Sequence, residues 1–364
     1  MKNLKVTIPA GEKHSYTIHI EADTLNGVLA EVDKLCPGKR PFIVTDKNLV
    51  KAGHLKTLLG GKDVPTYIIE PAGEISKHIN TVVAIIETME KAFFGRDTVI
   101  VALGGGTVGD IAGFAAAIFK RGIEVVQIPT TTVSQADSSV GGKTGVDSTI
   151  SKNAFGAFWQ PKAVYIDVET LKTLDDRQYR AGLVESVKHA LIADDDYFQF
   201  FLDNIDAILQ RDSDVLEKIA FSNCRIKAEI VEEDPTEKNR RRVCNYGHTI
   251  GHAVETASGF NLLHGEAVAI GIVGAGLIEH QLGLADNEQL DLIKKLLLRL
   301  GMPVTIPKEI NKNGLLDIIK RDKKAVDKWP KFVLIEKIGT ARCVDGQWAQ
   351  DISKEMVKTV LKKL

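Results

Sequence analysis

Short runs of β-branched and aromatic residues alternate with helical patterns in the first half of the chain. The runs with strand character are 41–46, 65–70, 97–106, 124–131 and 163–170. Apolar residues with helical spacing lie between several of them, as at 80–91 and 110–120. This alternation predicts a Rossmann-like α/β unit in which helices cover a mostly parallel sheet.

The second half has a different pattern. From about residue 176 the apolar positions follow long helical repeats, as at 177–209 and 288–301, and only 331–346 has the pattern of a hairpin. A chain of 364 residues is long for a single core. We therefore predict an α/β domain at 1–176 and a mainly α-helical domain at 177–364.

Composition excludes several classes of partner. The net charge of −1 provides no overall field for nucleic acid or an anionic membrane. The four cysteines form no CxxC pair, and the apolar stretch 267–278 is too short to cross a bilayer. Residues 1–20 alternate as in a strand and lack the apolar core of a signal peptide. We expect a cytoplasmic protein that binds neither nucleic acid nor membrane.

A glycine turn between a strand and a helix suggests a nucleotide site. Gly104, Gly106 and Gly109 match GxGxxG, a pattern that lets backbone N–H groups approach a pyrophosphate. A tight βα turn that packs closely on its helix would give the same pattern. The acidic residue expected about 20 positions later is missing, but Asp46 ends an earlier strand. We predict a nucleotide site that differs from the usual Rossmann arrangement, with its acidic residue, Asp46, on an earlier strand.

The stretch 135–161 combines glycines, hydroxyls and cations in a way that suits a phosphate. It contains Asp137, Lys143, Lys152 and Asn153, with a GGK grouping that allows close approach of the backbone. A solvated surface loop is the alternative. Further cations follow at Arg121, Lys188, Lys227 and 240–242. The triple arginine is typical of a solvated turn, but its place just before 244–248 makes one member a candidate to face the site.

The histidines of 245–266 are candidates for a metal site. His248 and His252 are four positions apart, so they share one face of a helix, and spacing alone selects this pair. Thr249 stands where a metalloprotease would have its general base, and hydrogen-bonded imidazoles on an ordinary helix are the alternative. His264 begins a new apolar helix. A catalytic zinc usually has three protein ligands, so a carboxylate is expected, and Glu185, Glu255 and Glu266 all remain open.

Five motifs in order give the chain a family resemblance. They are SSVGGKTGVD (138–147), KNAFGAFWQP (152–161), AGLVESVKH (181–189), NYGHTIGHAVE (245–255) and LLHGEAVAIG (262–271). With them the chain resembles the 3-dehydroquinate synthases, a family of sugar phosphate cyclases, from 72–77 to 322–324. Departures are Ser151 for a frequent glycine, Gln178 for a frequent glutamate, and VESVKHA for AEVIKYG.

The resemblance implies a role for individual residues. It assigns a divalent metal, Zn²⁺ or Co²⁺, to Glu185, His248 and His264, and it makes His252 a substrate-side group. It assigns NAD to Asp46, Ala72, Gly73, Glu74, Ile75, Ser76, Lys77, Gly105, Gly106, Thr107, Val108, Gly109, Asp110, Thr130, Thr131, Lys143, Lys152, Thr170, Leu171, Lys172 and Thr173. It assigns the substrate to Asp137, Lys143, Asn153, Lys188, Lys227, Arg241, Asn245, His252 and a lysine of the DKK motif, such as Lys324, with Arg121 reaching across a homodimer interface.

The resemblance also implies a reaction. The expected substrate is a small sugar phosphate, 3-deoxy-D-arabino-heptulosonate 7-phosphate, and the products are 3-dehydroquinate and phosphate, a carbon–oxygen lyase reaction of the shikimate pathway. The implied steps are transient oxidation with NAD, β-elimination of phosphate, reduction, ring opening and intramolecular aldol closure. The alternatives are another sugar phosphate cyclase and a metal-dependent polyol dehydrogenase, which would need fewer substrate cations.

Overall fold

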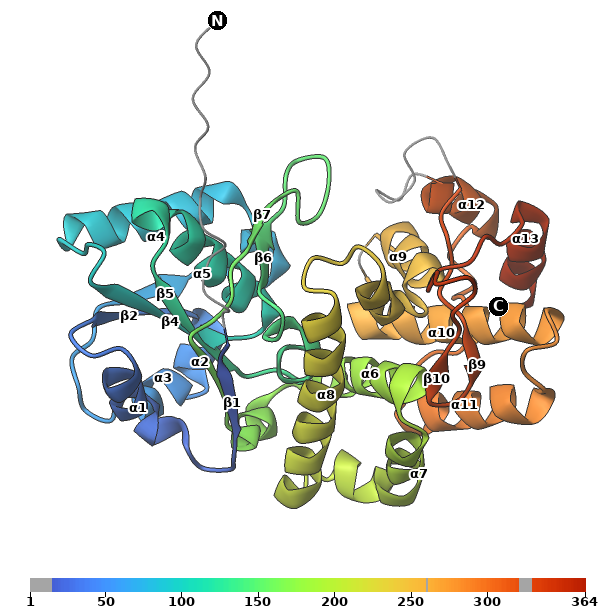
Figure 1. The fold of residues 1–364 in the computed structure, drawn as a ribbon, viewed down its shortest axis with the longest axis horizontal. Coiled ribbons are helices and arrows are strands. Elements are labelled where there is room, and N and C mark those ends of the chain that lie inside the picture. The colour runs from blue at the N-terminus through green and yellow to red at the C-terminus, as the bar shows by residue number, and fades with distance from the viewer. Residues whose placement is uncertain (1–14, 260, 321–328) are drawn as a thin grey trace, which may run out of the picture.

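A computed structural model describes residues 15–259, 261–320 and 329–364. It has a sheet-containing part built from the first half of the chain and a helical part built from the second half (Figure 1). The α/β and helical parts predicted from the sequence are thus confirmed. The helical part starts with α6 (Asp176–Ala193). The division into two domains at 176 stays a prediction.

The main sheet has six strands, and every pair of neighbours in it is parallel. Its order is β1-β8-β5-β4-β2-β3. The strands are β1 (Thr17–Ile20), β2 (Arg40–Asp46), β3 (Thr66–Ile69), β4 (Thr98–Gly104), β5 (Glu124–Pro129) and β8 (Ala163–Ile166). The direction in which new strands are added reverses between β2 and β4, and ligands of open α/β sheets bind beyond the strand ends at such a point.

Helices cover both faces of this sheet because its central strands are apolar on both sides. On β4, Ile100 and Ala102 pack in one core cluster with helices α4 (Ile79–Lys91) and α5 (Gly106–Ile118). Val99 and Val101 face the opposite cluster, with α1 (Val28–Leu35) and α3 (His54–Leu59). The remaining elements of this part are α2 (Lys47–Lys51), the short helices η1 (Leu25–Gly27), η2 (Glu74–Ser76) and η3 (Phe119–Arg121), the π turn η4 (Ser134–Ser138), η5 (Val168–Thr173), and the antiparallel hairpin of β6 (Lys143–Val146) and β7 (Phe155–Phe158).

The helical part buries one large apolar cluster. After α6 its elements are α7 (Asp195–Leu209), α8 (Ser213–Glu233), η6 (Arg240–Asn245), α9 (His248–Ala257), α10 (His264–Gln281), α11 (Asn287–Arg299), α12 (Lys312–Lys320) and α13 (Lys354–Lys363). The hairpin predicted at 331–346 is present as the antiparallel strands β9 (Ile335–Lys337) and β10 (Thr340–Ala341). Among the described helices, none is long and apolar enough to cross a lipid bilayer.

Candidate active site

The residues predicted to hold a nucleotide follow strands at the reversal point of the sheet. Asp46 ends β2, and Gly105 and Gly106 open α5 directly after β4. Asp46 caps α2, accepting from the backbone N–H groups of Asn48 (2.8 Å) and Leu49 (3.1 Å), and burial raises its pKa. The N-cap residue of α5 is Gly105, which has no side chain that could accept hydrogen bonds from the N–H groups of the first turn. This geometry suits an anionic group at the start of α5.

Two predicted nucleotide segments, 72–77 and 105–110, contact each other. The Thr107 hydroxyl donates to Glu74 Oε2 at 3.1 Å, and Lys77 Nζ lies 2.6 Å from Asp110 Oδ2. Burial alone would lower the pKa of Lys77, but Asp110 and Glu74 raise it. Lys152 joins this group, with its Nζ 3.6 Å from Glu74 Oε1. The structure therefore brings together residues from η2, α5 and the β6–β7 loop.

The other predicted nucleotide contacts are distributed more widely. Thr130 Oγ1 is buried and forms no hydrogen bond with any described residue, whereas the Thr131 hydroxyl bonds to that of Ser134 at 2.9 Å. Thr170 is buried and its hydroxyl bonds to Gln135 and to the carbonyl of Asp167. Lys172 pairs with Glu169 at 2.7 Å. The orphaned hydroxyl of Thr130 is thus the one of these groups that lacks a partner in the described structure.

Glycines let α10 approach α6 and α9 closely. A Cβ on Gly265 would lie 1.8 Å from the carbonyl oxygen of Ala181, and one on Gly271 would lie 1.9 Å from that of Gly247. Gly247 itself has a φ of 76°, which favours glycine, and it precedes the first residue of α9. These contacts hold the start of α10 against α6 and the start of α9 against α10.

The consequence is that three candidate metal ligands converge. Glu185 Oε1 lies 3.3 Å from His264 Nε2 and 3.5 Å from His248 Nε2. This oxygen is buried and forms no hydrogen bond among the described residues. The Nδ1 of His248 faces the carbonyl of Tyr246 at 3.0 Å, which leaves the Nε2 lone pair directed at Glu185. One carboxylate and two imidazoles in this arrangement fit a divalent cation.

His252 lies beside this group. Ligand atoms of His248, His252 and His264 all lie within 4.8 Å of one another. The pair selected by helix spacing alone, His248 and His252, is therefore close in space, but the two imidazoles that lie within 3.5 Å of Glu185 Oε1 are those of His248 and His264. Glu266, another open candidate, bonds instead to Arg177 and to the backbone N–H of Leu263.

The ionisation of the group follows from burial and charge. Burial opposes the charged form of Glu185, but Lys188 and the two histidines hold its pKa well below the usual range. Burial lowers the pKa of His248 strongly. Burial alone would lower the pKa of His264 too, but the neighbouring carboxylates of Glu185 and Glu255 raise it to about 9.

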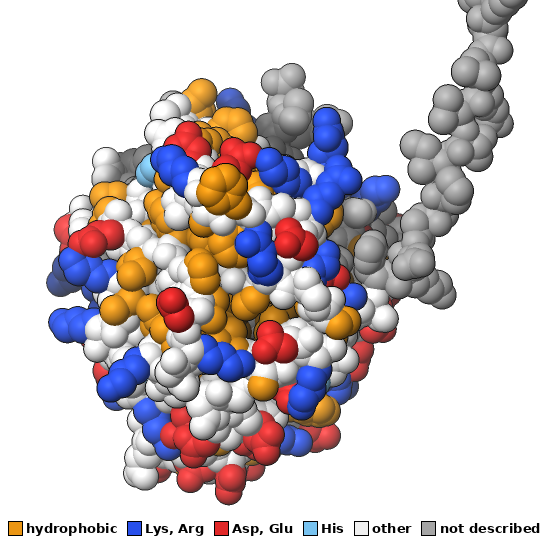
Figure 2. All heavy atoms as spheres, turned by 90° about the vertical axis from the view of Figure 1, so that its left-hand side faces the viewer, with side chains coloured by type: hydrophobic (Ala, Val, Ile, Leu, Met, Phe, Trp, Pro, Cys, Tyr) orange, Lys and Arg blue, Asp and Glu red, His pale blue; other side chains and the backbone are white. Residues whose placement is uncertain are grey.

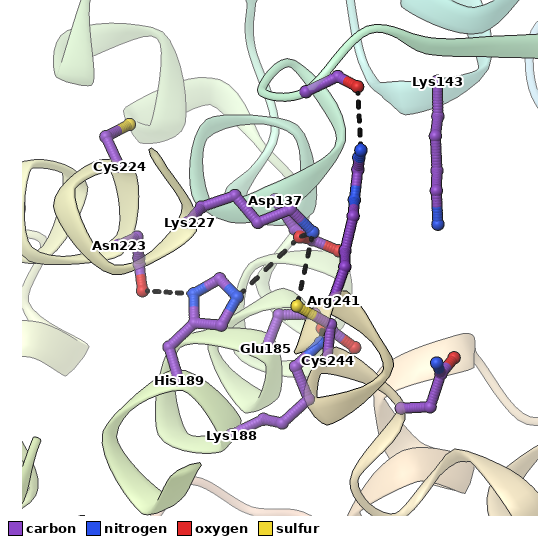
Figure 3. A network of polar contacts seen from close by, with 12 residues as sticks. Asp137, Lys143, Glu185, Lys188, His189, Asn223, Cys224, Lys227, Arg241 and Cys244 are labelled. Atoms are coloured by element: carbon purple, nitrogen blue, oxygen red, sulfur yellow. Dashed lines mark hydrogen bonds and ion pairs between the residues drawn. The ribbon is translucent and has the colours of Figure 1, made fainter. Parts of the chain in front are cut away.

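A buried cluster of charges adjoins the histidines (Figure 3). Lys188 pairs with Glu185, and Lys227 pairs with Asp137. Asp137 comes from η4 of the sheet part, whereas Lys188 and Lys227 come from α6 and α8. Burial would raise the pKa of Asp137, but the two lysines hold it far below its ordinary value, so Asp137 is a carboxylate. The ion pair joins the two parts of the molecule at the site.

Of the triple arginine, Arg241 is the buried member. Its Nη1 donates to the carbonyls of Pro235 (2.8 Å) and Gly141 (3.1 Å), and it is 1% exposed. Lys143, from β6, pairs with Glu237, which also accepts from Asn245 Nδ2 at 2.9 Å. Glu237 therefore links two predicted substrate residues.

Three predicted substrate residues stand apart from these contacts. Asn153 is exposed, has a φ of 51°, and its backbone N–H donates to Asp147 at 2.6 Å. Arg121 is exposed at the end of η3, and it forms no hydrogen bond or ion pair with the cluster among the described residues. Lys324 lies outside the described residues.

Sequence reasoning missed three residues at this site. Glu237 lies in a charged run that has no distinguishing pattern. His189 is fully buried between Asn223 Oδ1, 3.1 Å from Nδ1, and Asp137 Oδ1, 3.7 Å from Nε2 (Figure 3). Glu255 was considered only as a metal ligand, yet it faces the Nδ1 side of His264. A signal for it existed, because residues 248, 252 and 255 lie on one face of α9.

Comparison with known proteins gives the family of this chain. Models of the 3-dehydroquinate synthase N-terminal and C-terminal regions match residues 67–181 and 182–325. The chain belongs to the 3-dehydroquinate synthase family. A 3-dehydroquinate synthase of Ruminiclostridium cellulolyticum is 45% identical over 83% of this chain and 85% of its own. One of Methylococcus capsulatus is 40% identical over 94% of both chains.

Solved structures of other sugar phosphate cyclases have the same fold as this family member. A 2-epi-5-epi-valiolone synthase from Streptomyces hygroscopicus, with NAD⁺ and Zn²⁺ bound, has a TM-score of 0.87 at 27% identity and covers 98% of this chain and 99% of its own. A 2-deoxy-scyllo-inosose synthase complexed with carbaglucose-6-phosphate, NAD⁺ and Co²⁺ has a TM-score of 0.86 at 27% identity, with coverage of 95% and 96%. A probable glycerol dehydrogenase from Sinorhizobium meliloti, at 14% identity and a TM-score of 0.67, is similar in fold.

Proposed function

We propose that the protein converts 3-deoxy-D-arabino-heptulosonate 7-phosphate to 3-dehydroquinate and phosphate, as a lyase that depends on NAD and a divalent metal. The observation that carries this proposal is the convergence of Glu185, His248 and His264 beside the buried lysines 188 and 227. Relatives that are 40–45% identical over most of their length are 3-dehydroquinate synthases, which supports the same substrate.

The chain has residues that suit both the divalent metal and NAD. Glu185, His248 and His264 would hold Zn²⁺ or Co²⁺, whose ligand preferences include carboxylate and imidazole. Asp46, the segment 72–77 and the turn 105–110 would hold NAD, with Thr130, Thr131 and Lys152 beside them. When bound, NAD supplies reversible hydride transfer and the metal supplies Lewis acidity at the hydroxyl that is oxidised.

The residues of the chain fix the substrate in one geometry. A sugar acid phosphate carries dense negative charge, and a protein of net charge −1 must gather cations locally to bind it. Lys143, Lys188, Lys227 and Arg241 would bind the carboxylate and phosphate and hold the reacting atoms in register. Asp137, kept ionised by its lysines, is a hydrogen-bond acceptor for a substrate hydroxyl, and His252 would contact the substrate beside the metal ligands.

The active form would be a homodimer in which Arg121 reaches the partner's site. Lys120 and Arg121 both have positive φ, 49° and 69°, in a turn that presents the Arg121 side chain to solvent. Figure 2 shows hydrophobic side chains gathered near the middle of the face formed by the sheet part, with charged side chains mostly around them. Contiguous apolar surface of this kind often marks a protein–protein interface. Light scattering after gel filtration tests the assembly state.

A direct assay separates the proposed substrate from those of the sister cyclases. The protein is incubated with NAD, Co²⁺ and one sugar phosphate at a time, and phosphate release is measured. The sugars are 3-deoxy-D-arabino-heptulosonate 7-phosphate, sedoheptulose 7-phosphate and glucose 6-phosphate. Rapid release from the first alone is the expected result, and faster release from either of the others would overturn the assignment.

A further inference from the structure

Glu255 occupies a bridging position between a candidate metal ligand and the proposed cofactor side. It lies on α9 and is 8% exposed. Its Oε2 lies 3.5 Å from Nδ1 of His264, and its Oε1 accepts from Nζ of Lys152 at 3.2 Å. One carboxylate thus contacts an imidazole from α10 and a lysine from the β6–β7 loop.

The contact with His264 bears on which ring nitrogen carries the proton. A histidine binds a metal as the neutral imidazole, and in that form an acceptor on Nδ1 favours the tautomer with hydrogen on Nδ1, which leaves the lone pair on Nε2. That Nε2 is the atom that lies 3.3 Å from Glu185 Oε1. His248 is oriented in the same sense, but by the backbone carbonyl of Tyr246 at 3.0 Å. The two imidazoles therefore each have an acceptor on the far nitrogen, one from backbone and one from a side chain.

The negative charge of Glu255 is balanced from the other side. Lys152 Nζ lies between Glu255 Oε1 (3.2 Å) and Glu74 Oε1 (3.6 Å). Glu74 in turn accepts from the hydroxyl of Thr107 in the first turn of α5. A continuous series of polar contacts thus runs from α5 through Glu255 to His264.

We propose that Glu255 is a positioning residue that fixes the Nδ1–H tautomer and the ring orientation of His264, so that its Nε2 is presented to the metal together with Glu185 and His248. The inference rests on the proposed function for the metal itself. Some metal-binding histidines donate their other ring N–H to a carboxylate. Replacing that carboxylate typically weakens metal binding by about 10- to 100-fold.

Co²⁺ binding tests this without any assay of turnover. The affinity of the purified protein for Co²⁺ is measured by competition with a chromogenic chelator, and the visible spectrum of bound Co²⁺ is recorded. We expect E255Q to bind Co²⁺ at least about tenfold more weakly than the parent, with a changed spectrum, because the amide lacks the charge that holds Nδ1–H. E266Q is the matched control: Glu266 follows His264 in α10 but pairs with Arg177, so affinity and spectrum should stay those of the parent.

Each outcome has one meaning. If E255Q matches the parent in affinity and spectrum, the positioning role is wrong while the metal site stands. If the parent itself binds no Co²⁺, the proposed metal-dependent function fails instead. Circular dichroism checks the fold, and if E255Q does not fold, E255D takes its place, since it keeps the charge but draws the carboxylate back from Nδ1 and should also weaken binding.

Discussion

Glu185 on α6 and His264 on α10 meet with Oε1 and Nε2 3.3 Å apart, although a long stretch of chain separates them. The contact depends on the glycine at 265, which lets α10 begin against the backbone of α6. Glu185 Oε1 is buried and forms no hydrogen bond among the described residues, so this oxygen is available to bind a cation. This relationship underlies the predictions about the metal.

The three histidines should differ in what they bind. We expect H264A to lose bound metal, because it removes one of the two Nε2 atoms that face Glu185. H252A should retain the metal yet turn over poorly. Metal content of each purified variant is measured by atomic emission, with turnover measured alongside. Loss of metal from H252A with retention in H264A would show that helix spacing was the better guide.

The Asp137–Lys227 ion pair should stabilise the fold as well as the site. K227M leaves a carboxylate without its main counter-ion at a largely buried position, and we expect it to lower the free energy of unfolding by about 3 kcal/mol. D137N/K227M should lose less than K227M alone, because it leaves no uncompensated charge. Urea denaturation measures both. K218M, an exposed lysine change on the same helix, is the control and should have little effect.

If D137N/K227M is no more stable than K227M, the uncompensated charge of Asp137 does not cause the loss of stability. The cluster in Figure 3 would then be stabilised by its other contacts.

Glu279 should make stability depend on pH. It is fully buried, accepts from the backbone N–H of Ile335 and the hydroxyl of Tyr246, and burial raises its pKa to about 8. In the unfolded chain this carboxyl ionises near pH 4.5, whereas in the folded protein it stays neutral up to about pH 8. The free energy of unfolding is therefore highest below pH 4.5, falls as the pH rises to about 8, and is constant above that. The slope is at most about 1.4 kcal/mol per pH unit.

E279Q removes that ionisation and should flatten the curve between these limits, as measured by denaturation at a series of pH values. The exposed E232Q serves as control and should keep the parent's slope. An unchanged slope in E279Q would mean that Glu279 is ionised in the folded protein.

The fold was largely predictable because its signals are local. Alternation of strand and helix patterns predicted the parallel sheet, and the apolar repeats after residue 176 predicted the helices. Short connecting pieces such as η4 were not predicted, because η4 packs against α6 and α8, which lie far along the chain.

The site was predictable only in part. Periodicity placed His248 and His252 on one helix face, but the approach of Glu185 and His264 depends on how three helices pack, which no spacing reveals. The family resemblance supplied those residues. Glu237 and His189 escaped notice because each acts through neighbours, Lys143 and Asn245 in one case and Asp137 and Asn223 in the other.

NAD should be recycled within each turnover. The alternative reading as a polyol dehydrogenase requires NADH to form in step with product, whereas the proposed reaction returns the hydride. Absorbance at the NADH band, followed together with phosphate release, distinguishes the two. We expect many equivalents of phosphate per NAD and no lasting NADH signal; accumulation of NADH equal to product would identify a dehydrogenase.

The most direct test of the account is phosphate release from 3-deoxy-D-arabino-heptulosonate 7-phosphate with and without a chelator, at catalytic NAD. We predict rapid release by the untreated protein, its loss on chelation, and its return on addition of Zn²⁺ or Co²⁺, because Glu185, His248 and His264 would bind the ion that the oxidation requires. Full turnover by a preparation shown to be free of metal would contradict it.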